Sequence, residues 1–382
     1  MTTPVSRHVP ELDGLRGIAI IVVLIHHQMT PLSLGGGFLG VDLFFVLSGY
    51  LITSLLWAEF ERTGSISLKN FYVRRLLRLG PALALYLVAS LAVTYHTQLI
   101  SLGRQLKLII IAILYSTNWR MALGWDSVLD PTAIIWSLSI EEQFYLVWPL
   151  LAFACFALGL KRGYMIGALA VTILSVALHR YFLYGAGVDL TRLYYGTDTR
   201  ADALLVGCVI AFVPVAIVGP RTKRSLGFAG MFAAVGLAYS MIALSFSNSL
   251  LYRGGFTVVA VLAGILIFVA ANSPPRILSL VLKWTPLRWF GHISYGLYLW
   301  HWLIVRNTSL YFLGRWEGSA RLVIALGIAS LSFYVVERPF NRLKSRYAAA
   351  AKSSPAEALP AEPKESLAPR SIPLANYQSS TP

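Results

Sequence analysis

Two histidines lie deep inside long apolar segments of this sequence. His27 follows Arg16 by eleven residues in ELDGLRGIAIIVVLIHHQ, and His301 lies in FGHISYGLYLWHWLI, just beyond Tyr298. Eleven helical residues rise about 16 Å, which places His27 near the middle of a bilayer if Arg16 marks its edge. An imidazole at that depth can accept a hydroxyl proton at neutral pH, so His27 is a candidate catalytic base. His301 and Tyr298 are candidate substrate-binding residues; the alternative for both histidines is helix packing.

Carboxylates near the ends of two other apolar segments could assist such a base. Asp42 lies near the start of GGFLGVDLFFVLSGYLI, and Glu141 and Glu142 stand together in WSLSIEEQFYLVWPLL. Adjacent residues of a helix point in different directions, so at most one of the two glutamates would face the inside of a bundle. We expect Asp42 or Glu141 to orient the imidazole and Glu142 to bind substrate hydroxyls. The alternative for the glutamates is a charge that complements the helix dipole.

Arginines supply the candidate groups for binding anions. Arg74, Arg75 and Arg78 form a basic ridge in FYVRRLLRLGPAL. Guanidinium groups bind phosphate oxygens through paired hydrogen bonds, so the ridge could hold a nucleotide. The alternative is orientation of the helix together with contact to anionic lipids. Further along, TDTRADALLVG holds Arg200 and Asp202, which could bind substrate or form an ion pair within the protein.

The composition indicates that membrane helices position these residues. Of the 382 residues, 57% are apolar and 13% are charged, and the mean hydropathy is +0.66, whereas soluble domains carry about 25% charged residues. We therefore predict an all-α, polytopic transmembrane bundle. A short apolar stretch within 106–118 covers only about 15 Å of helix and is expected to be half-inserted. Ten full spans are predicted at 15–32, 38–57, 80–96, 143–160, 164–182, 201–219, 226–246, 255–271, 290–310 and 318–336.

The net charge of +15 comes from short basic clusters between the apolar segments. Such clusters orient membrane spans, so nucleic acid is not expected as a partner. Ten spans with both termini in the cytoplasm put about 19 basic residues inside and about 10 outside, as the positive-inside rule favours. Residues 1–346 would form one membrane domain, and 347–382, rich in Ala, Pro, Ser and Glu, a disordered cytoplasmic tail. The two cysteines give no disulfide framework, and no metal site is predicted.

Taken in order, these motifs resemble the membrane-integral acyltransferase 3 family, whose members O-acylate bacterial envelope polysaccharides, lipid-linked sugars or small secreted molecules. The resemblance covers residues 11–340 and rests on LDGLRGIAIIVVLIHH, GVDLFFVLSGYLI, FYVRRLLRLGPAL, WSLSIEEQFYLVWP, TRADALLVG, GHISYGLYLWHW and ERPF. It implies that His27 is the essential histidine, eleven residues after Arg16. It also implies that Arg75 and Arg78 form a basic RxxR element associated with acyl-CoA on the cytoplasmic face, and that Glu141 is the glutamate of a WSLxxE motif.

The resemblance and the topology together imply an enzyme. The expected activity is transfer of an acyl group, in the first place acetyl, from cytoplasmic acyl-CoA to a hydroxyl of a carbohydrate or small-molecule acceptor. Acyl-CoA would be a co-substrate, bound by Arg16 and the basic ridge, and no permanently bound cofactor is expected. The expected bilayer is the bacterial cytoplasmic membrane. The alternative is a transporter, which would show broken helices mirrored in two halves; the sequence shows no such symmetry.

Overall fold

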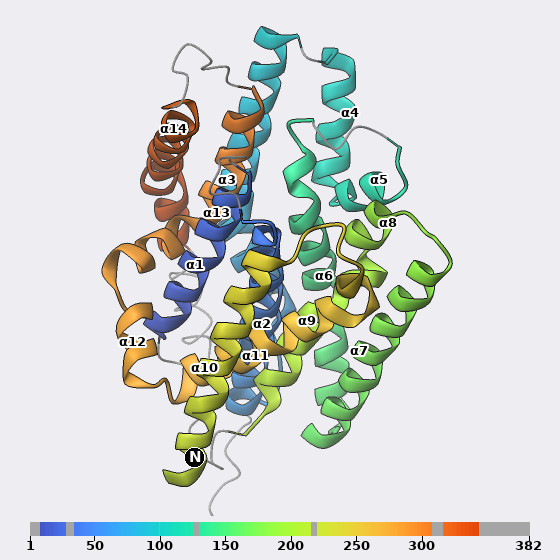
Figure 1. Cartoon of the computed structure of the whole chain (residues 1–382), viewed down its shortest axis with the longest axis vertical. Coiled ribbons are helices and arrows are strands. Elements are labelled where there is room, and N and C mark those ends of the chain that lie inside the picture. Colours follow the sequence, from blue (N-terminus) through green and yellow to red (C-terminus); the bar gives the residue numbers. More distant parts are fainter. Residues whose placement is uncertain are drawn as a thin grey trace, which may run out of the picture.

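The computed structural model is a bundle of helices (Figure 1). It describes residues 8–27, 34–98, 100–125, 130–214, 220–307 and 316–343, and every regular element in these ranges is a helix or helical turn. The predicted all-α class is thereby confirmed, while the predicted tail at 347–382 lies outside the described residues. The long helices are α1 (Pro10–His27), α2 (Gly40–Thr63), α3 (Leu68–Thr97), α6 (Trp136–Ala157), α7 (Arg162–Gly185), α9 (Thr197–Phe212), α10 (Pro220–Ala243), α11 (Phe256–Asn272), α13 (Thr285–Asn307) and α14 (Glu317–Ser332). The short elements are η2 (Gly37–Leu39), α4 (Leu102–Ile113), α5 (Thr117–Ala122), η3 (Ala133–Ile135), α8 (Leu190–Tyr195), η5 (Leu251–Gly255), α12 (Arg276–Leu282) and η7 (Phe333–Glu337).

Each of the ten predicted spans overlaps one of the long helices. Within the described residues, seven helical segments are long and apolar enough to cross a membrane, which makes the chain a multi-pass membrane protein. The remaining three long helices are less suited to contact lipid, since α1 carries three charged residues among 18 and α9 has only 16 residues. The third, α13, is interrupted by histidines and arginines.

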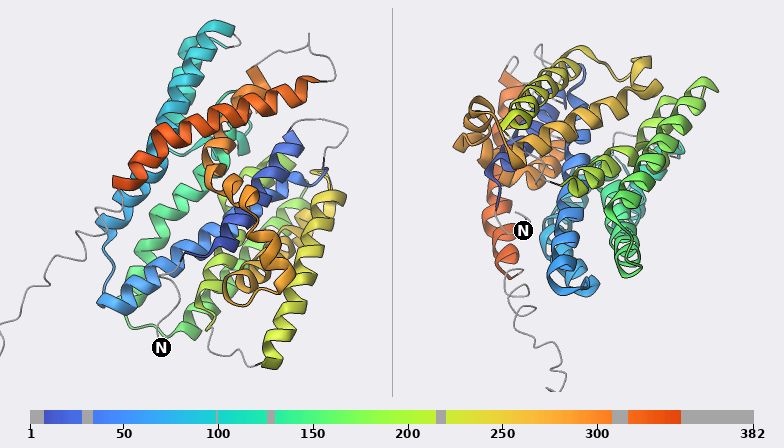
Figure 2. Two further views of the ribbon diagram at one scale, coloured as in Figure 1. Left: turned by 90° about the vertical axis from the view of Figure 1, so that its left-hand side faces the viewer. Right: turned by 90° about the horizontal axis from the view of Figure 1, so that it is seen from below.

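These three helices lie inside the bundle. Helix α1 packs against α13 and α2, and α9 packs against α2, α7 and α11. Figure 2 shows α1 and α2, in blue, between the green helices α6 and α7 and the orange and red C-terminal helices. A helix enclosed by other helices does not need an apolar surface all round. The central helices can therefore carry the histidines, aspartates and arginines that the sequence singled out.

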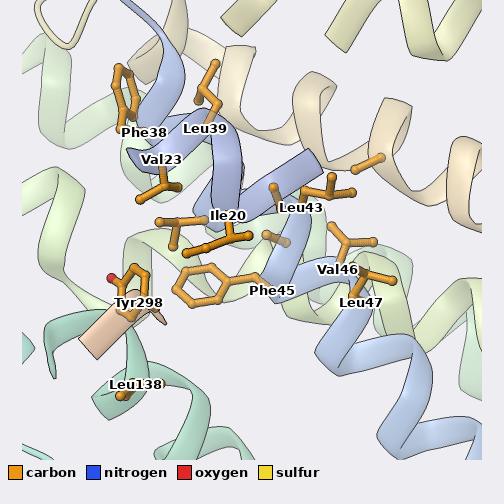
Figure 3. Packing of buried hydrophobic residues seen from close by; sticks show 14 of the residues in the cluster. Ile20, Val23, Phe38, Leu39, Leu43, Phe45, Val46, Leu47, Leu138 and Tyr298 are labelled. Atoms are coloured by element: carbon orange, nitrogen blue, oxygen red, sulfur yellow. The ribbon is translucent and has the colours of Figure 1, made fainter. Parts of the chain in front are cut away.

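Glycines allow the central helices to approach closely. A Cβ atom added at Gly49 of α2 would collide with the carbonyl oxygen of Leu204 in α9, and one at Gly40 would lie 2.6 Å from the carbonyl oxygen of Ala19 in α1. Small residues at such positions are typical of membrane helix interfaces. Around these contacts, aliphatic and aromatic side chains fill the space between α1 and α2; Figure 3 shows Ile20 beside Phe45 and Leu43.

The segment predicted to be half-inserted forms α4 and α5. Helix α4 has 12 residues, about 18 Å of rise, which is less than the hydrocarbon thickness of about 30 Å. It packs against α3 and ends before Tyr115, which has a positive φ of 49°. The helix begins at Leu102, a few residues earlier than the sequence indicated.

Candidate active site

A cavity of about 70 Å³ opens among α1, α2, α3, α6 and α13. Its charged lining residues are Arg16 from α1, Arg75 and Arg78 from α3 and Glu141 from α6. The structure thus brings together four residues from three of the predicted motifs, and we call this space the inner cavity. Its other polar lining residues are Ser48, Ser137, Tyr145, Ser294, Tyr295 and Tyr298.

The three arginines of the inner cavity are half-buried and differ from the fully buried arginines of the bundle. Arg16, Arg75 and Arg78 form no ion pair with an acidic residue in the part of the chain that the structure describes, and Arg16 Nε has no hydrogen-bond partner there. The buried arginines outside the cavity each pair with an aspartate: Arg120 with Asp130 at 2.7 Å, Arg180 with Asp202 at 2.9 Å and Arg200 with Asp42 at 2.9 Å. Three half-buried guanidinium groups without acidic partners give the inner cavity a positive charge that favours an anion.

Glu141 is held by two hydroxyl groups within the same cavity. Ser48 Oγ donates to its Oε1 at 3.1 Å and Tyr145 Oη donates to its Oε2 at 3.2 Å. The Arg75 guanidinium lies over the Tyr145 ring, 4.8 Å from the centroid. One carboxylate against three guanidinium groups leaves the cavity positive.

Two other residues predicted for this region lie elsewhere. Arg74 pairs with Glu59 at 3.3 Å and does not line the inner cavity. Adjacent helical residues diverge by about 100°, which separates it from Arg75. Glu142 likewise does not line the cavity and diverges from Glu141 in the same way.

His27 and His301 form a hydrogen-bonded pair between α1 and α13. His27 Nδ1 lies 2.9 Å from His301 Nε2, with the ring planes 21° apart. His301 Nδ1 lies 2.9 Å from the carbonyl oxygen of Leu297 and must donate, because a carbonyl only accepts. In the neutral pair, His301 Nε2 is then the acceptor and His27 Nδ1 the donor. This leaves the lone pair of His27 on Nε2, the arrangement that a base requires.

This geometry corrects the expectation that Asp42 or Glu141 orients the His27 ring. His27 Nδ1 is bonded to His301, Glu141 is engaged by Ser48 and Tyr145, and Asp42 faces α9, where it accepts from Arg200. His301, expected to bind substrate, is instead fully buried behind His27.

A second cavity of about 170 Å³, the outer cavity, has His26 and His27 in its lining. Trp136 lines it while the next residue, Ser137, lines the inner cavity. Ser137 Oγ and Tyr298 Oη are 2.7 Å apart, and the Tyr298 ring lies 5.8 Å from that of His301. Tyr298 of the inner cavity therefore contacts His301, which in turn bonds to His27 of the outer cavity. The outer cavity is lined by His26, His27, Phe38, Met121, Ala133, Ile134, Trp136, Tyr194, Tyr195, Phe246 and Trp302.

Arg200 and Asp202 belong to a buried network beside the outer cavity. Arg200, paired with Asp42, lies 3.9 Å from the centroid of the Phe256 ring, and Asp202 accepts from Arg180 and from Thr257 at 2.6 Å. Neither residue lines the inner or the outer cavity. This is the internal ion-pair arrangement that the sequence left open as an alternative to substrate binding.

Sequence reasoning missed Ser48 and Tyr145 as partners of Glu141, and Tyr194 and Tyr195 as cavity residues. The aromatic pair in LTRLYYGTDTR was a visible signal, because it directly precedes a polar motif. The sequence could not have identified Arg180 as the partner of Asp202, since nothing in its own segment shows that it faces α9.

The fold and the site define a polytopic membrane protein with a hydrogen-bonded histidine pair, a positively charged cavity and an aromatic cavity. The family model for the acyltransferase domain of the acyltransferase 3 family matches residues 9–336. The chain therefore belongs to this family.

Curated relatives carry names that agree with this membership. The chain is 37% identical over 361 residues to the peptidoglycan O-acetyltransferase OatA of Listeria monocytogenes, covering 89% of this chain and 57% of the relative. It is 35% identical over 353 residues to the putative peptidoglycan O-acetyltransferase YrhL of Bacillus subtilis, covering 88% of this chain and 55% of the relative. The chain thus spans little more than half the length of these relatives. No solved structure matches it significantly.

Proposed function

We propose that the chain is a membrane O-acetyltransferase that moves an acetyl group from acetyl-CoA in the inner cavity to a hydroxyl of a polysaccharide or other acceptor in the outer cavity. The observation that carries the proposal is the set of three arginines without acidic partners, together with a histidine pair of which His27 lines a second cavity. The names of the relatives support acetyl as the group and a polysaccharide as the acceptor.

The donor would enter from the cytoplasmic side of the bacterial inner membrane. Basic clusters predict that both termini and the mouth of the inner cavity face the cytoplasm. The phosphates of acetyl-CoA would bind Arg75 and Arg78, because guanidinium groups bind phosphate in bidentate fashion. Arg16, also in the cavity, would contact the chain that leads to the thioester.

The proposed chemistry uses the tautomer that the histidine pair fixes. His27 Nε2 accepts the proton of the acceptor hydroxyl while the hydroxyl oxygen attacks the thioester carbonyl carbon. The carbon–sulfur bond breaks, the sulfur leaves as thiolate, and the proton passes from His27 to it. The products are the acetyl ester and free CoA. His301 stays neutral and supports the positive charge on His27 through the shared hydrogen bond.

The test is transfer of radiolabelled acetyl from acetyl-CoA in membranes that contain the intact chain. His27→Ala should abolish incorporation, whereas Arg75→Ala/Arg78→Ala should raise the KM for acetyl-CoA at least tenfold, because a hydrogen bond to a charged group is worth about 1.5–3 kcal/mol. Arg62→Ala, an exposed arginine at the end of α2, is the matched control and should behave as the wild type. Equal incorporation by wild type and His27→Ala would refute the proposal, and a covalent label retained on His27 would replace base catalysis by an acyl-histidine step.

A further inference from the structure

Three side chains that can bind metal ions meet where α1 begins beside α13. His8 lies two residues before α1, Asp13 lies in its first turn and His292 lies on α13. Asp13 Oδ2 is 2.7 Å from His8 Nε2 and 3.3 Å from His292 Nε2. One ligand atom of each residue lies within 4.8 Å of those of the other two, and the described part of the chain holds no other such group of three. We call these residues the helix-end cluster; because His292 follows Asp13 by 279 positions, the sequence spacing did not indicate it.

The contacts in the helix-end cluster are not ordinary hydrogen bonds. Asp13 Oδ2 is buried and has no hydrogen-bond partner among the residues that the structure describes, although two imidazole nitrogens lie beside it. The separate pair of His179 and Asp198, by contrast, forms a hydrogen bond at 3.0 Å. Buried polar atoms normally have such a partner. Asp13 Oδ2 is therefore free to bind a cation together with the two imidazole nitrogens.

The neighbouring charges do not occupy the carboxylate of Asp13. Glu11, also in the first turn of α1, accepts from Ser279 at 3.0 Å and pairs with Lys283 at 3.0 Å. Asp13 pairs with no lysine or arginine in the described ranges and contacts only the two histidines as basic groups. Two imidazoles and one carboxylate are a ligand set that Zn²⁺ and related divalent transition metals accept.

The distances in the helix-end cluster suit a small divalent cation. Zn²⁺ binds nitrogen and oxygen ligands at about 2.0–2.1 Å, so two ligand atoms of a tetrahedral site lie about 3.3 Å apart. His292 Nε2 and Asp13 Oδ2 already have this separation. His8 is 62% exposed, so its side chain has room to move out to the same distance. Three protein ligands leave one tetrahedral position for water.

Close packing of α1 against α13 holds two of the ligands in place. A Cβ atom added at Gly291, the neighbour of His292, would collide with the carbonyl oxygen of Asp13, so the two backbones touch at the cluster. The same two helices carry His27 and His301 further along. Asp13 precedes His27 by 14 residues, about 21 Å of helical rise, so an ion at the cluster lies far from the proposed reaction.

We propose that the helix-end cluster is a binding site for a divalent transition-metal ion of the Zn²⁺ type, held by His8 Nε2, Asp13 Oδ2 and His292 Nε2. The ion joins the beginning of α1 to α13 and stabilises this pair of helices. The inference goes beyond the proposed function and does not depend on it.

The experiment measures Zn²⁺ binding to the full chain in lipid nanodiscs by isothermal titration calorimetry, after the affinity tag and any bound metal have been removed. One saturable site per chain is expected. His292→Ala and Asp13→Asn should each raise the Kd at least tenfold, because loss of even an outer hydrogen-bond partner of a metal ligand weakens binding about 10- to 100-fold. The matched control is His179→Ala, which removes an exposed histidine beside the carboxylate of Asp198; its Kd should equal that of the wild type.

Thermal unfolding in the same nanodiscs tests whether the ion stabilises the helices. Zn²⁺ should raise the unfolding temperature of the wild type and of His179→Ala but not that of His8→Ala, because a ligand stabilises only a state that binds it. His8 is exposed and precedes α1, so its replacement should leave the fold intact.

One further variant excludes the histidine pair as the metal site. His27→Ala keeps the helix-end cluster and should bind Zn²⁺ with the wild-type Kd. Three results would overturn the inference: no saturable binding of Zn²⁺, a Kd that His292→Ala leaves unchanged, or binding that His27→Ala abolishes. Mg²⁺ that displaces Zn²⁺ at equal concentration would also overturn it, because Mg²⁺ prefers oxygen ligands to imidazole.

Discussion

Replacement of His301 tests whether the histidine pair sets the position of the proton at the site. His301 Nε2 is the acceptor for His27 Nδ1 at 2.9 Å, and His301 is fully buried. His301→Ala leaves the half-buried N–H donor of His27 without its acceptor, which costs about 1–3 kcal/mol. Because this partner orients the base, the loss would appear in the transition state as a fall in kcat of roughly fivefold to 150-fold. The KM for acetyl-CoA should stay close to that of the wild type, since Arg75 and Arg78 are untouched.

The conservative variant His301→Gln separates positioning from packing. Its amide oxygen can reach the place of Nε2 and accept from His27, so it should recover most of the lost kcat. Leu299→Ala truncates a fully buried side chain two residues away on α13. It is the control for the loss of packing that any such truncation causes. The assay is acetyl transfer to glycerol at saturating acetyl-CoA, with thermal unfolding measured for each variant. If His301→Gln is as inactive as His301→Ala while both unfold at the wild-type temperature, or if His301→Ala keeps its kcat, the reasoning is refuted.

Two structural predictions concern stability. Asp42→Ala should lower the free energy of unfolding by about 3–5 kcal/mol, because it leaves the Arg200 guanidinium buried and unpaired. The double variant Asp42→Leu/Arg200→Met should recover most of that loss. Thermal unfolding in detergent checks both variants, and an Asp42→Ala variant as stable as the wild type would contradict the ion pair. Gly49→Ala should also destabilise the protein, since its Cβ would meet the Leu204 carbonyl. The matched change Gly167→Ala, with no atom within 4 Å, should instead stabilise α7 by about 0.5–1 kcal/mol; the same unfolding measurement compares them, and equal effects would contradict the close packing.

The sequence predicted that His27 and His301 lie at a similar depth, but not which side chains meet. Depth follows from counting residues along an apolar segment, so His27 and His301 were both placed near mid-bilayer, and the structure brings them into contact. The partner of a polar residue depends on the rotation of each helix about its axis. A span that is apolar on most faces carries little information about that rotation. Asp42 and Arg200, 158 positions apart, could therefore be proposed as charges with a function but not as each other's partner.

The same limit explains why the basic ridge was only partly predicted. Three arginines at FYVRRLLR suggested one binding surface, yet Arg74 turns to Glu59 while Arg75 and Arg78 line the inner cavity. A spacing of three residues keeps side chains on one helix face, whereas neighbours in sequence diverge. By this rule Arg78 shares a helix face both with Arg75, three residues away, and with Arg74, four residues away, so the spacing alone could not decide which of the two lines the inner cavity with it.

Arginine pairing separates structural charges from functional ones in this bundle. A charge enclosed by helices is stable only with a counter-ion, and the structure supplies an aspartate for the buried arginines near the outer cavity. Neutralising the three inner-cavity arginines in the same way would have required only a few further carboxylates. The inner cavity instead keeps one glutamate, and that glutamate is bound to hydroxyls. Three half-buried guanidinium groups without acidic partners therefore make the inner cavity, and not the paired network, the site where we expect an anion to bind.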